Sequence, residues 1–266
     1  MTRTERLIDA LEPPRGGTTA FVGGGGKTSA ILLLAEELAA AGRPVVVTTT
    51  TRVGSSMADA LPLVLAPEGG DLAPARMALE RALRERGCAF VSGGADEEGK
   101  FRSAGMRTLD ELTEGLVVDA ILVEADGSRQ RPLKAPAAHE PVIPPRARLV
   151  VPVAGLDSLG RTLGPDVAHR PERVAAVCGV AAGADVEVTP ELLASLLSSP
   201  QGGLRSVPRS AQVRPILNKV RMVSEELAVR AAGLLLERAD ERMDRVIVSD
   251  VLSGWFGYVA SGSASP

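Results

Sequence analysis

The stretch that decides the fold lies near the amino terminus, where a short apolar segment runs into four glycines, a lysine and a threonine: Thr18-Thr19-Ala20-Phe21-Val22-Gly23-Gly24-Gly25-Gly26-Lys27-Thr28. Thr18–Val22 is rich in β-branched and aromatic residues, which favours a buried strand. Over Lys27–Ala41 the apolar residues recur at helical spacing, and Gly42 is suited to end that helix. The stretch therefore predicts a strand, a tight glycine turn and a helix in direct succession.

The glycine turn has the composition of a phosphate-binding P-loop. Glycines carry no Cβ, so their N–H groups can close around a phosphate, and the helix start adds further donors and a positive dipole end. Lys27 would reach the terminal phosphates and the Thr28 hydroxyl would ligate Mg²⁺. The longer pattern G-x-x-x-x-G-K-[ST] needs a glycine where this chain has Phe21, which leaves the shorter G-x-x-G-K-T. We expect ATP or GTP to bind Gly23, Gly24, Gly25, Gly26, Lys27, Thr28 and Ser29.

Short apolar runs alternate with helical patterns along the rest of the chain, as is typical of an α/β fold with a mostly parallel sheet. Further strands are predicted over Pro44–Thr49, Leu63–Leu65, Ala89–Val91, Ala120–Glu124, Leu149–Val153, Val213–Leu217 and Arg245–Val248. Further helices are predicted over Pro74–Arg86, Thr108–Gly115, Pro190–Leu197 and Ser224–Glu241, with Thr189 as the cap of the third. With the glycine turn, these elements predict a P-loop NTPase-like three-layer sandwich.

The chain has 266 residues and no composition break that would mark a domain boundary. We expect one α/β domain over residues 1–260 and a disordered tail over 261–266. Polar, glycine-rich or proline-rich stretches predict irregular excursions over 93–106, 127–148 and 198–210.

Charge and cysteine usage limit the class of protein. The net charge is −3 and no Lys/Arg block stands out, so binding to nucleic acid or to an anionic membrane has no electrostatic footprint. Neither a signal peptide nor an apolar run of membrane-spanning length is visible. Cys88 and Cys178 are too far apart in sequence for a CxxC pair, which favours free thiols in a reducing compartment. We therefore expect a cytoplasmic protein.

The strand predicted over Ala120–Glu124 ends in two carboxylates. The i, i+2 spacing of Glu124 and Asp126 puts both on the same side of an extended chain. P-loop proteins use a carboxylate at this place to hold Mg²⁺ or to orient water, although acids in a loop can also be merely solvated. Gly127 would let its N–H approach a terminal phosphate. The predicted catalytic residues are Lys27, Glu124 and Asp126, with Mg²⁺ held by Thr28, Glu124 and Asp126.

Two other predicted strand ends carry polar residues. Thr50 and Arg52 follow one of them and could bind phosphate, a metal or a second substrate, or simply pack there. Asn218 and Lys219 follow another, as in the N-K-x-D tetrad that reads guanine in GTPases, but Arg221 replaces its aspartate. These two residues could flank a base, and the choice between ATP and GTP stays open.

The excursion over 127–148 is the predicted switch or second-substrate region. Its candidate residues are Gly127, Arg129, Lys134 and His139, and His169 further along the chain joins them. Each histidine could act as an acid–base group or metal ligand near neutral pH, or could be structural. Asp157, which follows the strand predicted over Leu149–Val153, is a further candidate of the same kind.

A series of motifs in this order resembles the YqeC family of selenium-dependent hydroxylase accessory proteins. The motifs are Phe21–Thr28, Val47–Thr51, Glu124–Arg129, Arg131–Pro136, His139–Pro144, Val153–Asp157, His169–Glu172 and Leu217–Val220. The resemblance implies a P-loop fold and a role beside molybdenum hydroxylases or the proteins that mature their molybdenum–pterin cofactor. Many members continue the last motif with aspartate, where this chain has Arg221.

The sequence is compatible with three functions. The first is an NTP-hydrolysing accessory protein whose nucleotide state controls the handover of a cofactor to a client enzyme. The second is an ATP-dependent small-molecule kinase or ligase, because the short G-x-x-G-K-T loop is similar to that of the Mur ligases. The third is a carrier that binds a nucleotide or a pterin cofactor without turnover.

Overall fold

A computed structural model of the chain describes residues 1–181 and 185–261, so only Ser261 of the predicted tail is described. One sheet runs through the molecule, with β10 (Gln212–Val213) pairing beside β8. The strand order along the sheet is β1 (Thr2–Thr4), β13 (Trp255–Ala260), β12 (Arg245–Asp250), β11 (Ile216–Asn218), β8 (Ala147–Gly155), β2 (Gly17–Gly23), β6 (Ala120–Glu124), β3 (Val45–Thr49), β5 (Cys88–Ser92) and β4 (Leu63–Leu65). All neighbours from β12 to β4 are parallel, and β13 is antiparallel to both of its neighbours, β12 and β1. The predicted α/β fold with a mostly parallel central sheet is confirmed.

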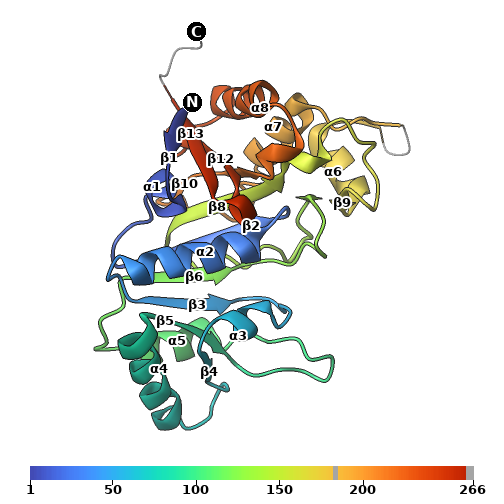
Figure 1. Cartoon of the computed structure of the whole chain (residues 1–266). Helices are drawn as coiled ribbons and strands as arrows, with labels where there is room; N and C mark the ends of the chain where they lie inside the picture. The colour runs from blue at the N-terminus through green and yellow to red at the C-terminus, as the bar shows by residue number, and fades with distance from the viewer. Residues whose placement is uncertain (182–184, 262–266) are drawn as a thin grey trace.

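Helices lie on both faces of this sheet (Figure 1). On β3 the side chains of Val45 and Val47 join one hydrophobic cluster, whereas Val46 between them joins another. The first cluster contains α1 (Leu7–Leu11), α2 (Lys27–Ala40) and α3 (Ser56–Ala60). The other face carries α4 (Ala73–Arg86), α5 (Met106–Thr113), α6 (Pro171–Cys178), α7 (Pro190–Ser198) and α8 (Glu225–Glu237).

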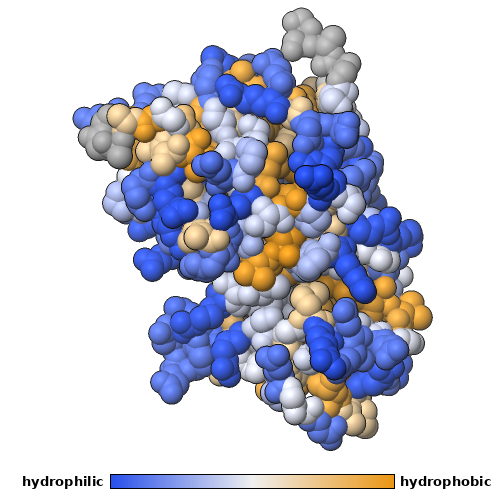
Figure 2. Space-filling view, turned by 180° about the vertical axis from the view of Figure 1, so that it is seen from behind, coloured by the Kyte–Doolittle hydropathy of each residue, from blue (hydrophilic) through white to orange (hydrophobic). Residues whose placement is uncertain are grey.

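The middle of this second face is covered by irregular segments. A small cluster there contains Val22 of β2, Val123 of β6 and Val150 of β8, and Ile143 and Val207 pack against it. Within the described part of the chain, no helix contributes to this cluster. The two covering residues belong to the excursions predicted over 127–148 and 198–210. In Figure 2 hydrophobic residues reach the surface in the middle of the molecule seen from behind.

The predicted strands and helices are largely confirmed, and one strand is wrong. The strand predicted over Val213–Leu217 is divided into β10 and β11, which both pair with β8. The break falls at Pro215, which has no N–H to donate to a neighbouring strand. The preceding Arg214 still donates its N–H to Val150 O at 3.1 Å, so the chain returns to the same sheet.

Helix ends differ from the predictions in smaller ways. The last long helix begins at Glu225 after its cap Ser224 but ends at Glu237, four residues before Glu241. The helix predicted over Thr108–Gly115 is α5, shifted by two residues towards the amino terminus. The predicted cap Thr189 is confirmed, because its hydroxyl accepts the N–H of Leu192 at 3.2 Å.

The 127–148 excursion is partly regular. Its last two residues belong to β8, and Leu133–Lys134 forms β7, which pairs in parallel with β9 (Ala168–His169) in a separate two-stranded sheet. Short 3-10 turns follow β8, β11 and β12, namely η1 (Leu156–Ser158), η2 (Val220–Met222) and η3 (Val251–Ser253).

The parallel strands place their carboxyl ends at one edge of the sheet, on the right in Figure 1. The glycine turn after β2 and the acidic residues at the end of β6 meet there, because these two strands are neighbours. The surface in Figure 2 is indented at its left margin, where the same edge lies after the half-turn of the view. None of the helices formed by the described residues combines the length and the hydropathy needed to cross a bilayer.

Candidate functional site

The glycine turn packs directly against the end of β8. Gly23, Gly25 and Gly26 have φ values of +94°, +76° and +120°, which favour glycine. A Cβ on Gly25 would lie 2.2 Å from Gly155 N, and one on Gly23 would lie 2.4 Å from Val153 O. The four glycines therefore serve both the backbone conformation and the close approach of two chain segments.

The first three N–H groups of the turn are bonded within the chain. Gly23 N–H donates to both oxygens of the Asp126 carboxylate at 3.1 Å. Gly24 N–H donates to Val153 O at 2.9 Å, and Gly25 N–H donates to Arg131 O at 3.0 Å. Helix α2 begins directly after the turn, and the first N–H groups of a helix have no acceptor within it. The start of α2 thus presents N–H donors beside the turn.

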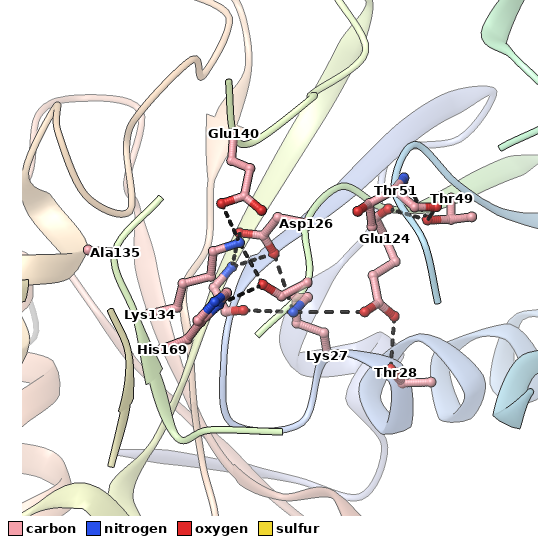
Figure 3. Close-up of polar contacts among 12 residues, drawn as sticks. Lys27, Thr28, Thr49, Thr51, Glu124, Asp126, Lys134, Ala135, Glu140 and His169 are labelled. Atoms are coloured by element: carbon pink, nitrogen blue, oxygen red, sulfur yellow. Dashed lines mark hydrogen bonds and ion pairs between the residues drawn. The ribbon is translucent and has the colours of Figure 1, made fainter. Parts of the chain in front are cut away.

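Lys27 is a buried cation between two carboxylates (Figure 3). Its side chain is 3% exposed, and its Nζ donates to Gly23 O at 2.6 Å. The same Nζ lies 3.3 Å from Asp126 Oδ1 and 3.8 Å from Glu124 Oε1. The two opposite charges compensate the cost of burying the ammonium group. The lysine of the glycine turn and both predicted acids are therefore in contact.

Glu124 forms a hydrogen bond with the first turn of α2. The Thr28 hydroxyl donates to Glu124 Oε2 at 2.8 Å, and the backbone carbonyl of Glu124 accepts the hydroxyl of Thr49 at 2.9 Å. Burial raises the pKa of the Glu124 carboxyl, although the Lys27 charge and the Thr28 hydrogen bond oppose this effect. A buried carboxylate that accepts a neighbouring threonine hydroxyl is a donor set that suits Mg²⁺.

Asp126 begins a chain of alternating charges that leads away from the turn. The Nζ of Lys134, whose side chain is fully buried, lies 3.0 Å from Asp126 Oδ2 and 3.1 Å from Glu140 Oε2, and it donates to Gly127 O at 2.7 Å. Arg170 Nη1 then donates to Glu140 Oε2 at 2.7 Å. The ion pairs thus connect the glycine turn to the start of α6, where Arg170 is the cap residue.

The surroundings of Glu140 favour its ionised form. Burial would raise the pKa of its carboxyl, but the Ala137 N–H and the Lys134 and Arg170 cations outweigh burial and lower the pKa from 4.5 to about 2. The folded state favours the ionised carboxylate more than the unfolded state does. The contribution of Glu140 to stability is therefore complete above its ordinary pKa. The stabilisation is lost as the pH falls from 4.5 towards 2.

Replacing Glu140 by glutamine is expected to reduce the acid sensitivity of the fold. Between about pH 5 and about pH 3, the free energy of unfolding of the native chain should fall by about 2 kcal/mol more than that of Glu140→Gln. Urea unfolding at the two pH values measures the difference. An equal fall in both proteins would contradict the assigned ionisation.

His169 lies next to this chain, and its Nδ1 is 3.3 Å from Gly127 O. Burial, followed by the charge of Arg170, lowers the pKa of the His169 imidazole, and the contact with Gly127 opposes this only in part. Glu140 and Arg170 were not predicted as site residues. Their only sequence signal is their place within the His139–Pro144 and His169–Glu172 motifs.

Several predicted residues lie outside the cluster of charges. The Thr50 hydroxyl donates to Val142 O at 2.7 Å, and Arg52 pairs with Asp96 at 2.6 Å in the 93–106 excursion. Arg129 and His139 are exposed, and neither forms an ion pair with a described residue.

Asn218 and Lys219 lie on the other side of the turn. The Asn218 amide donates to Gly25 O at 2.9 Å, and its oxygen accepts the Ser249 hydroxyl and the Val251 N–H at 3.1 Å each. Asn218 thus joins the ends of β2, β11 and β12. Lys219 Nζ lies 2.7 Å from Asp157 Oδ2. Asn218 contacts the turn directly, whereas Lys219 pairs with a residue of η1, and contact of either residue with a base stays a prediction.

The described residues contain no group of three or more His, Cys, Asp or Glu side chains that could hold a metal ion alone. Mg²⁺ sites for nucleotides do not require such a group, because one or two carboxylates act together with phosphate oxygens and water. Thr28 and Glu124 fit that pattern.

Fold and site together define an α/β protein that carries a glycine-rich turn, a buried lysine and two buried carboxylates at the carboxyl edge of a mostly parallel sheet. Comparison with known proteins identifies the group more narrowly. The chain belongs to the YqeC family, because the family model described as YqeC protein matches residues 19–172. The match includes the glycine turn and the charges up to Arg170, and it ends before Asn218.

A curated relative agrees with this assignment. The chain is 32% identical over 154 residues to a protein of Escherichia coli (strain K12) described as "Uncharacterized protein YqeC". The matched part is 58% of this chain and 59% of the relative, so the match spans less than two thirds of that protein's length. The description of the relative assigns it no activity.

Proposed function

We propose that the chain is a P-loop NTPase that binds a Mg²⁺–nucleoside triphosphate at the glycine turn and hydrolyses it. The observation that carries this proposal is the contact of Lys27 with both Glu124 and Asp126 at the start of α2. The succession of β2, glycine turn and α2, with β6 as the neighbouring strand, further supports the P-loop assignment.

The phosphate groups would lie over the start of α2. The N–H groups there and the Lys27 ammonium donate to phosphate oxygens, and the helix dipole favours negative charge at the same place. Lys27 has three donors and already uses one for Gly23 O, so two remain for phosphate or carboxylate oxygens.

Mg²⁺ would be held by Thr28 and Glu124. When bound, the ion neutralises developing charge on the phosphates and polarises the bond that breaks. Asp126 is less suited to this role, because the ammonium groups of Lys27 and Lys134 lie 3.3 and 3.0 Å from its oxygens. Two cations at that distance repel a third. The predicted metal set of Thr28, Glu124 and Asp126 therefore reduces to the first two in this proposal.

The client of the reaction follows from the family resemblance rather than from the geometry. We infer a cytoplasmic accessory role in the maturation of a molybdenum hydroxylase or its molybdenum–pterin cofactor. A nucleotide-driven step of this kind needs a segment that responds to the phosphates, and the segment after Asp126 contacts the turn directly.

Phosphate release from ATP and from GTP with Mg²⁺ tests the proposal. Lys27→Ala should weaken triphosphate binding by about 10- to 100-fold, which corresponds to a charge-assisted hydrogen bond, and should abolish measurable turnover. Lys100→Ala is the matched control, since Lys100 is half-exposed and pairs with Glu98 far from the turn in sequence. The faster of the two nucleotides identifies the base that the site prefers.

Lys27→Ala removes a buried cation from between two buried carboxylates, so its melting temperature must be measured as well. Lys27→Arg, which retains the positive charge, separates loss of the fold from loss of phosphate contacts. Binding of both nucleotides by a folded Lys27→Ala with native affinity would overturn the proposal. Binding without turnover in the native chain would favour the carrier or ligase function.

A further inference from the structure

We propose that the Asp126 carboxylate and the segment after it compete with the terminal phosphate of the nucleotide, so that the glycine turn is held closed by its own chain. The inference rests on the proposed phosphate site and adds a regulatory contact to it.

Asp126 occupies donors of the turn as an anion would. Its carboxylate accepts Gly23 N–H with both oxygens at 3.1 Å and pairs with Lys27 Nζ at 3.3 Å. A backbone N–H is a single donor, so Gly23 cannot serve a phosphate while it serves Asp126. A phosphate oxygen beside this carboxylate would also face a like charge in a buried place, where repulsion is strong.

The following segment takes a further donor and covers the turn. Gly25 N–H donates to Arg131 O at 3.0 Å, and Gly155 N–H donates to Pro132 O at 3.0 Å. A Cβ on Gly24 would lie 2.5 Å from Arg131 O and 2.9 Å from Pro132 O, so these two carbonyl oxygens lie directly against the turn. Carbonyl oxygens are acceptors like phosphate oxygens, and the two cannot share this place.

Asp126 and the 127–132 stretch can separate from the glycine turn together. Lys134 binds Asp126, Glu140 and Gly127 O together, so it can keep the Asp126 charge paired when Lys27 turns to a phosphate. Between these residues Arg129 and Gln130 have φ values of +51° and +61°. Non-glycine residues hold such a conformation only where their surroundings impose it. Phosphate binding should therefore detach the 127–132 stretch from the turn.

The decisive variant is Asp126→Asn, which retains the shape and removes the competing charge. We expect it to bind inorganic tripolyphosphate, and a nonhydrolysable ATP or GTP analogue, at least about fivefold more tightly than the native chain does. Glu36→Gln removes an exposed carboxylate from α2, retains every contact of the turn, and should not tighten binding. The melting temperature of each variant confirms that it is folded.

A second readout follows the segment itself. Arg129 is exposed, so trypsin can cut after it. Adding tripolyphosphate to the native chain should speed this cleavage several-fold, and in Asp126→Asn the cleavage should be fast already. Equal rates with and without the polyphosphate, under conditions where it binds, would overturn the release of the segment.

The outcomes separate the two proposals. Nucleotide binding by the native chain with equal or weaker binding by Asp126→Asn overturns the competition and leaves the phosphate site standing. Binding by Asp126→Asn alone supports the competition in its strongest form. Failure of both proteins to bind tripolyphosphate or either nucleotide overturns the phosphate site and the competition together.

Discussion

Replacing Gly25 by alanine is expected to lower the free energy of unfolding by about 4 kcal/mol, from overpacking and a strained left-handed backbone combined. The new methyl group would lie 2.2 Å from Gly155 N and 2.6 Å from Ala154 C. Both atoms are backbone, and Ala154 and Gly155 end a strand that pairs with β2 and β11. Neither side of the contact can retreat without breaking sheet hydrogen bonds, and total stabilities are only about 5–15 kcal/mol.

Gly42→Ala is the matched control for this prediction. Gly42 has a similar φ of +68°, but a Cβ there meets nothing within 4 Å. Only backbone strain remains, so the free energy of unfolding should fall by about 1 kcal/mol. Urea unfolding of the two variants separates the cost of the steric contact from the cost of the left-handed backbone conformation. Equal losses would show that the close packing of the turn on β8 contributes nothing to stability.

Glu124→Gln is expected to reduce Mg²⁺-dependent phosphate release by about a hundredfold or more, because it removes the one carboxylate assigned to the ion. Glutamine has the same length and can still accept the hydrogen bond from the Thr28 hydroxyl, so the fold should be retained. Binding of a triphosphate without Mg²⁺ should change little. The variant should therefore need a higher Mg²⁺ concentration for turnover, and its maximal rate should be lower.

The control for this variant is Glu36→Gln, a change of the same chemistry on the exposed side of α2. Rates of phosphate release measured against Mg²⁺ concentration compare the three proteins. Because burial raises the pKa of Glu124, protons compete with Mg²⁺ for its carboxylate, so native turnover should fall as the pH is lowered. Native rates in Glu124→Gln would remove Glu124 from the metal site.

The local parts of this structure could be predicted from the sequence. The strand, glycine turn and helix over Thr18–Ala41 depend on neighbouring residues, and the structure shows them as β2, the turn and α2. Glu124 and Asp126 follow a strand of only apolar residues, and a parallel sheet brings its carboxyl ends together. Their contact with Lys27 therefore follows from two short patterns.

The remaining parts depend on pairings between distant segments. Glu140 meets Lys134 and Arg170 because β7 pairs with β9, and strands of two residues carry no periodic signal. The strand β13 is antiparallel to its neighbours β1 and β12 and mixes glycine with aromatic residues, so it lacks the continuous apolar run of the buried strands. The break at Pro215 could have been predicted from the missing N–H alone.

The irregular cover on the middle of the second face affects the heat capacity change of ligand binding. Ile143 and Val207 cover Val22 and Val150 from irregular segments rather than from a helix, so any ligand that moves those segments wets apolar side chains of the central strands. Wetting apolar surface raises the heat capacity, whereas ordinary ligand binding lowers it. The binding enthalpy of a nucleotide that moves these segments should then increase with temperature. Calorimetry of nucleotide binding at several temperatures would therefore detect the exposure of Val22 and Val150 to water.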